Sequence, residues 1–285
     1  MNIKEKNDLE LIKEIFKINK IKDYINYLER IQEKWNSLGK KEKKVFLNNI
    51  HEAFYFYFMS LRVDYNLFNE KPYTVYKPKD SMKYFITKQF CGMQKIDEVN
   101  KYIDELKFLL SNFTDKHNTE RVSKNDIDNL FNLVYQKYPK LEEIFSSVEI
   151  EILLFNNTDK ISNSLTTPSL DNKHFTIYCL YMKDEPDRKR VEDFHYYVFL
   201  HELGHILCWL VTKKNQVPSS FIEETKESYA GLTIDNPDAL EVFADSFAML
   251  VMHESNYAYA NPFEHFHENH YVVLKKYFDK LINEL

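Results

Sequence analysis

Two histidines four residues apart, with a glutamate beside the first, are the residues of this chain whose spacing most clearly suggests chemistry. His201, Glu202 and His205 lie in the segment FLHELGHIL, residues 199–207, which is otherwise apolar apart from Gly204. If the segment is helical, residues i and i+4 share one face, so both imidazoles can bind the same ion. Neutral imidazole suits Zn²⁺ at about 2.0–2.1 Å. We therefore expect His201 and His205 to be zinc ligands.

The glutamate between these histidines has a different expected role. Glu202 is rotated by about 100° from His201 around a helix axis, so it cannot easily be a third ligand. It can reach a zinc-bound water and act as the general base on it. Gly204 is notable because the chain has only four glycines and a glycine inside a helix costs about 1 kcal/mol relative to alanine. Its missing side chain would let another backbone approach the metal closely.

A catalytic zinc site needs a third protein ligand and an open fourth position. The segment EVFADSFA, residues 241–248, places Glu241 and Asp245 four residues apart among small residues that would let this helix pack close to the first. Glu241 is the expected third ligand, and Asp245 could accept the free ring N–H of a ligating histidine and orient it. Rival carboxylates lie in an acidic patch near a predicted loop: Glu223, Glu224 and Glu227.

The alternative is that neither segment binds a metal. The first would then be a core helix whose histidines are satisfied by their neighbours, and the second an amphipathic helix with an exposed acidic face. His51 and Glu52, in HEAFYFYF, illustrate that alternative because no second histidine follows at ligand spacing. We interpret that pair as packing residues.

The pattern HELGH followed by a helix of the form E-x-x-A-D-x-F-A resembles the gluzincin zinc metallopeptidases. Two branches are similar: the anthrax lethal factor catalytic domain with the Pro-Pro endopeptidases, and the ImmA/IrrE-type peptidases. The resemblance covers about residues 147–285 and implies a zincin-like domain with a small twisted sheet, an active-site helix and a ligand helix. It also implies that His201, His205 and Glu241 hold one zinc per chain and that Glu202 is the catalytic base.

A donor that stabilises the transition-state oxyanion would complete such a site. The lethal-factor branch has a tyrosine about two turns before its third ligand, where this chain has Ile234, and the nearest tyrosine is Tyr229. Tyr229 is therefore one candidate for a catalytic residue. The other candidates lie towards the C-terminus: Tyr257, Tyr259, His265, His267 and His270.

The elements that must position these residues divide the chain into two regions. Residues 1–145 show helical periodicity, and we expect a helical region there that recognises a substrate or a partner. One helix is expected from about residue 12 to residue 35, whereas NEKPYTVYKPKD, residues 69–80, has two prolines and is expected to be a loop. Residues 146–285 are expected to form the zincin-like domain, so the predicted fold class is α+β.

Short β-branched segments begin the second region. SVEIEILLF (147–155) and KHFTIYCLYM (173–182) are typical of strands, and the polar residues between them are typical of a loop. The second strand is the best candidate for the edge along which an extended substrate could pair, although its composition also fits a buried central strand. We expect helix starts at a capping box of Ser123 with Asp126, at Asn236 with Pro237, and near Pro186.

Composition limits the classes of protein that fit. The chain has 285 residues, of which 44% are hydrophobic and 15% aromatic, enough for a large core and against global disorder. Its net charge of −6 is spread along the chain, so there is no basic stripe for nucleic acid. Three cysteines are widely spaced and lack a CxxC pair, so we expect core thiols rather than disulfides or a thiolate metal site: Cys91, Cys179 and Cys208.

The expected compartment follows from the absence of targeting signals. The charged start of the chain does not resemble a signal peptide, and no run of about 18 apolar residues predicts a membrane span. We expect a cytoplasmic protein, with export or delivery by a non-classical route as the alternative.

The leading hypothesis is a zinc-dependent endopeptidase that acts on a protein or peptide. Its alternatives are an inactive zincin-fold binding module and a delivered toxin-type protease. The intact Glu202 favours turnover, because a binding module has no need of the base.

Overall fold

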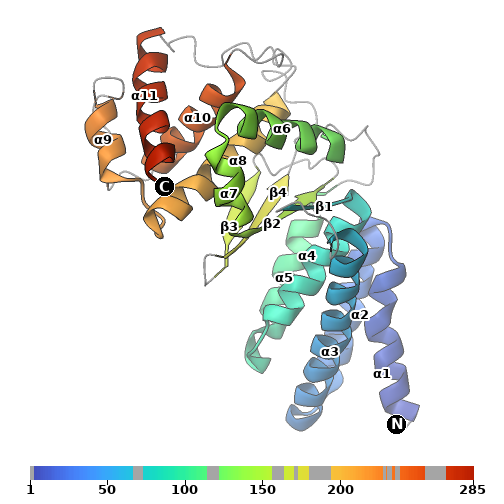
Figure 1. The fold of residues 1–285 in the computed structure, drawn as a ribbon. Coiled ribbons are helices and arrows are strands. Elements are labelled where there is room, and N and C mark those ends of the chain that lie inside the picture. The colour runs from blue at the N-terminus through green and yellow to red at the C-terminus, as the bar shows by residue number, and fades with distance from the viewer. Residues whose placement is uncertain are drawn as a thin grey trace. The chain divides into compact units, whose positions relative to one another are not determined.

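The computed structural model has an α+β fold and describes residues 3–66, 73–113, 122–155, 164–169, 173–179, 194–226, 229, 233–234, 238–253 and 268–285. The chain divides into two compact units (Figure 1). Unit 1 comprises Met1–Glu70, Tyr76–Asn118 and Leu154–Ile161, and unit 2 comprises Lys71–Val75, Thr119–Leu153 and Ser162–Leu285. None of the described helices combines the length and apolar character needed to cross a bilayer.

Unit 1 is built from helices that bury aromatic side chains. Its elements are α1 (Ile3–Lys13), η1 (Glu14–Lys17), α2 (Ile21–Ser37), α3 (Lys40–Asn66), α4 (Pro78–Gly92), η2 (Ile96–Glu98) and α5 (Val99–Leu110). Helix α3 packs against α1 and α4, and α2 packs against α5. The rings of Phe54 and Phe90 meet edge to face at 5.4 Å, and both are fully buried. The predicted helical character of this region is confirmed.

Two local predictions within the first 80 residues were wrong. The helix expected from residue 12 to residue 35 is interrupted between η1 and α2, where tyrosine hydroxyls bind backbone carbonyls: Tyr24 donates to Ile18 O at 3.0 Å and Tyr27 to Ile12 O at 3.0 Å. The loop expected over residues 69–80 contains strand β1 (Tyr73–Tyr76), and Pro78 opens α4 because proline needs no N–H partner in a first turn.

A four-stranded sheet lies in unit 2 with the order β1-β2-β4-β3. Strands β2 (Glu149–Leu154) and β4 (His174–Cys179) are buried along nearly their whole length, which confirms both predicted strands. Strand β4 is therefore a central strand, so the prediction that placed it at the edge was wrong and the central alternative is confirmed. Buried central strands are apolar on both faces, which explains its composition.

The edge next to β4 is β3 (Leu165–Pro168), within a segment that the sequence predicted to be a loop. It pairs antiparallel with β4, and Thr166 lies opposite Ile177. Its residues are exposed or partly exposed, which fits the two threonines of the sequence LTTP. Pro168 stands at its last position, where a missing N–H costs no ladder hydrogen bond.

The helices of unit 2 cover this sheet and each other. They are α6 (Lys124–Lys137), α7 (Lys140–Ser146), α8 (Phe194–Thr212), α9 (Ser219–Thr225), α10 (Asp238–Met252) and α11 (Glu268–Glu284). Helix α8 packs along α10 on one side and against β3 and β4 on another (Figure 1). The capping box of Ser123 and Asp126 at the start of α6 is confirmed. The expected helix starts near Pro186 and at Asn236 lie outside the described residues.

The division into units differs from the boundary near residue 145 that the sequence suggested. Helices α6 and α7 precede that boundary but belong to unit 2. The reason is packing: the fully buried Phe131 of α6 meets the ring of Phe145 at 6.4 Å and the ring of Phe199 on α8 at 5.7 Å. None of the three cysteines forms a disulfide, and Cys179 and Cys208 are buried as expected.

Candidate metal centre

Helices α8 and α10 approach so closely at Gly204 that no side chain fits there. A Cβ added to Gly204 would lie 2.8 Å from Ala244 Cα and 3.0 Å from Ala244 O. Both neighbours are backbone atoms, which cannot rotate out of the way. The expectation that Gly204 admits another backbone is confirmed, and the small Ala244 provides the matching surface on α10.

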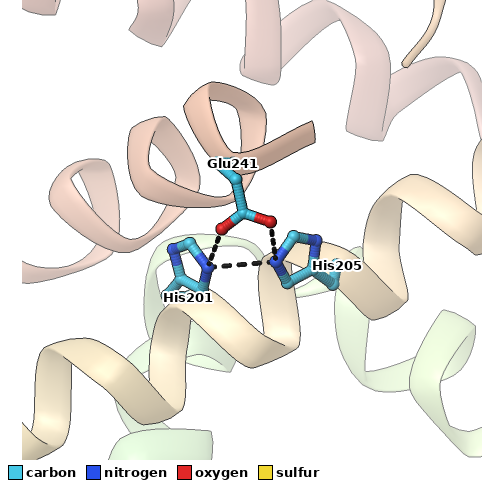
Figure 2. Close-up of side chains that lie close together, drawn as sticks. All are labelled: His201, His205 and Glu241. Atoms are coloured by element: carbon cyan, nitrogen blue, oxygen red, sulfur yellow. Dashed lines mark hydrogen bonds and ion pairs between the residues drawn. The ribbon is translucent and has the colours of Figure 1, made fainter. Parts of the chain in front are cut away.

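This close approach brings together three side chains from the two helices. Figure 2 shows the carboxylate of Glu241 extending from α10 towards the imidazoles of His201 and His205 on α8. The two Nε2 atoms are 3.0 Å apart. Glu241 Oε2 lies 3.1 Å from His201 Nε2, and Oε1 lies 3.5 Å from His205 Nε2. These three residues form a possible metal-binding group, with ligand atoms within 4.8 Å of one another.

The donor set and its spacing suit zinc. Atoms bound at about 2.0–2.1 Å in a tetrahedron are about 3.3–3.4 Å apart, and the measured separations of 3.0, 3.1 and 3.5 Å fall on both sides of that value. Two imidazole nitrogens and one carboxylate are also the ligands of a known type of catalytic zinc site, which leaves the fourth position open. The residues present therefore fit the metal.

Asp245 holds the outer nitrogen of the first histidine. Its Oδ1 accepts from His201 Nδ1 at 2.7 Å and from the Tyr197 hydroxyl at 2.5 Å. The first contact leaves Nε2 of His201 facing Glu241, and it is the hydrogen bond expected of Asp245. Burial alone would lower the pKa of His201, but hydrogen bonds to Asp245 and Glu241 outweigh it and raise that pKa to about 10 in the metal-free chain. Hydrogen bonds from both histidines lower the pKa of Glu241.

Glu202 lies beside the cluster without being part of it. Only 4% of Glu202 is exposed, and its Oε2 accepts a hydrogen bond from Thr166 Oγ1 at 2.6 Å. Burial raises the pKa of this carboxyl, whereas Thr166 and the two histidines act in the opposite direction. Glu202 and the three clustered residues line one cavity of about 770 Å³ between β3, α8 and α10. Its wall also includes the apolar side chains of Leu165, Val198 and Trp209.

The candidates for an oxyanion donor are placed differently. The hydroxyl of Tyr229 shares a 2.9 Å hydrogen bond with Ser246 Oγ, and its ring lies 6.3 Å from that of His270. Neither Tyr229 nor His270 is among the described residues that line the cavity, whereas Tyr197 is. The remaining candidates lie outside the described residues: Tyr257, Tyr259, His265 and His267.

The rival carboxylates do not join the cluster where they are described. Glu224, on α9, forms an ion pair with Lys280 at 2.7 Å, and Glu223 is exposed on the same helix. Glu227 lies outside the described residues.

Sequence reasoning missed two residues of the site. Tyr197 stands four residues before His201 and eight before His205, so helical spacing alone could have identified it. Thr166 carried no such signal, because its segment had the composition of a loop.

Comparison of the chain with protein-family models, with curated proteins and with solved structures finds no match. The function is therefore inferred from the residues of the site.

Proposed function

We propose that this protein is a zinc-dependent endopeptidase that hydrolyses a protein or peptide substrate. The observation that carries the proposal is the convergence of His201, His205 and Glu241 beside the buried carboxylate of Glu202 in one cavity. When bound to the three converging side chains, zinc would supply a Lewis acid that polarises a peptide carbonyl and lowers the pKa of water to about 7.

The side chains of this chain would divide the remaining work. Glu202 accepts the proton of the attacking water and is the general base. Asp245 keeps His201 turned so that Nε2 faces Glu241 and His205. The cavity borders strand β3, whose side away from β4 pairs with no other described strand and could bind an extended peptide by main-chain hydrogen bonds. That geometry favours a peptide over a compact small molecule as the substrate.

Metal analysis and cleavage of a peptide library by the full chain test this proposal. We expect about one zinc per chain and cleavage that stops when a chelator removes the metal. Glu202→Gln should retain zinc and fold while losing about 10²–10⁴-fold in rate, because the amide cannot accept the proton. Glu241→Ala should lose zinc and activity together.

Glu223→Gln is the matched control, because it removes an exposed carboxylate outside the cavity and should change neither zinc content nor rate. A Glu202→Gln variant that cleaves at the wild-type rate would contradict the mechanism. Stoichiometric zinc without cleavage of any peptide would favour the inactive binding module.

A further inference from the structure

The carboxylate of Glu202 is held by a residue of the edge strand. Thr166 Oγ1 lies 2.6 Å from Glu202 Oε2 and 3.3 Å from the backbone oxygen of the same residue. A hydroxyl has one proton to donate, and the shorter contact is typical of a hydroxyl bound to an ionised carboxylate. The donor is therefore directed to the side chain of Glu202.

This hydrogen bond supplies a partner to a buried carboxylate. Glu202 is 4% exposed, and a buried carboxylate needs hydrogen-bond partners. Within the described part of the chain, Thr166 is the side chain that donates to it. A glutamate side chain also has several rotatable bonds, and it loses about 1.5–2 kcal/mol of rotamer entropy when it is fixed. An existing hydrogen bond means that this ordering has taken place before a substrate arrives.

The position of Thr166 is itself determined by the sheet. Its backbone pairs opposite Ile177 of the central strand β4. Because side chains alternate along a strand, Thr166 and Thr167 point to opposite faces. Thr167 is hydrogen-bonded to Tyr178 of β4 and does not line the cavity. Only the first of these two adjacent threonines is directed at the base.

We infer that Thr166 is a positioning residue that orients the carboxylate of Glu202 for proton transfer. By occupying Oε2, it leaves the other carboxylate oxygen to receive the proton. This inference rests on the proposed peptidase function. It also means that the strand predicted to be a loop supplies a part of the machinery that no motif in the sequence contains.

The test compares isosteric variants of the full, zinc-loaded chain on a peptide that the wild type cleaves. Thr166→Val keeps the shape and the β-branched carbon but removes the donor. We expect kcat to fall about 10- to 100-fold, because misplacing a reacting group by about 1 Å has an effect of that size. KM and zinc content should stay unchanged. Thr166→Ser keeps the hydroxyl and should recover most of the loss, and Thr167→Val is the control on the opposite face.

A second measurement separates positioning from a structural role. In a Glu202→Gln background, adding Thr166→Val should lower kcat less than it does in the wild type, because the base that Thr166 orients is absent. A structure of the zinc-loaded Thr166→Val variant should show the Glu202 carboxylate turned from its wild-type direction. Full activity of Thr166→Val with the carboxylate unmoved would overturn the inference and leave the peptidase proposal intact. Loss of zinc by Thr166→Val would also overturn it. A wild-type chain that cleaves no peptide would overturn both.

Discussion

Replacing Gly204 by alanine would test whether the close approach of α8 and α10 assembles the candidate site. The new Cβ would lie 2.8 Å from Ala244 Cα, 3.0 Å from Ala244 O and 3.3 Å from Ala244 C. Carbon atoms make favourable contact at about 3.5–4.0 Å, so the two helices must separate locally by about 0.7 Å. All three opposing atoms are backbone, so no flexible side chain can absorb the shift.

The expected loss of stability follows from two opposing effects. Overpacking of a tight interior costs about 1–3 kcal/mol, whereas alanine in place of a helical glycine contributes about 1 kcal/mol. Because the helix backbones must move, the overpacking cost should lie at about 2–3 kcal/mol, so we expect the free energy of unfolding to fall by about 1–2 kcal/mol net. Urea unfolding in the presence of a chelator would measure this without a contribution from bound metal.

The same displacement acts on the candidate metal ligands. Glu241 is on α10 and both histidines are on α8, at distances of 3.1 and 3.5 Å from its carboxylate oxygens. Moving the helices apart by about 0.7 Å takes the shorter distance beyond the roughly 3.3–3.4 Å that a tetrahedral zinc requires and takes the longer distance further from it. We expect zinc affinity to fall at least about 10-fold, measured by competition with a chelating dye.

Gly92→Ala is the matched control, because a Cβ there meets nothing within 4 Å. It should leave zinc affinity unchanged and raise the free energy of unfolding by up to about 1 kcal/mol. A Gly204→Ala protein that is as stable as the wild type and binds zinc equally well would refute the reasoning.

Four further predictions concern other residues and a truncated chain. Asp245→Ala should weaken zinc binding by roughly 10–100-fold without removing a ligand, and an unchanged affinity in the dye titration would contradict its role. Phe131→Ala should lower the free energy of unfolding by about 3–5 kcal/mol in urea titrations, because the ring is fully buried. A chain truncated to start near residue 145 lacks this buried ring, and we expect it to show no cooperative unfolding. Burial raises the pKa of the Cys208 thiol to about 12, so the reactive thiolate of this residue is scarce at pH 8. In the native protein a thiol reagent should modify the half-buried Cys91 first. The buried Cys179 and Cys208 should react only when the protein unfolds.

Much of the candidate site could be predicted from the sequence because its spacing is local. His201 and His205 share a helix, as do Glu241 and Asp245, so a period of 3.6 residues was enough to place each pair on one face. The capping box at Ser123 could be predicted for the same reason, because all its partners lie within one turn. The α+β class followed from the apolar patterns of the central strands and helices.

The edge strand and the partners of the base were decided only by the tertiary structure. Strand β3 forms because its backbone pairs with β4, and backbone hydrogen bonds leave no pattern in the side chains of a polar edge. Thr166 and Glu202, which are hydrogen-bonded, are 36 positions apart in the sequence. Phe131 and Phe199, whose contact places α6 with unit 2, are 68 positions apart. Contacts at such separations depend on the way in which whole elements pack. The sequence could therefore name the candidate metal ligands and the proposed base, whereas only the packed chain could show which side chain holds the Glu202 carboxylate in place.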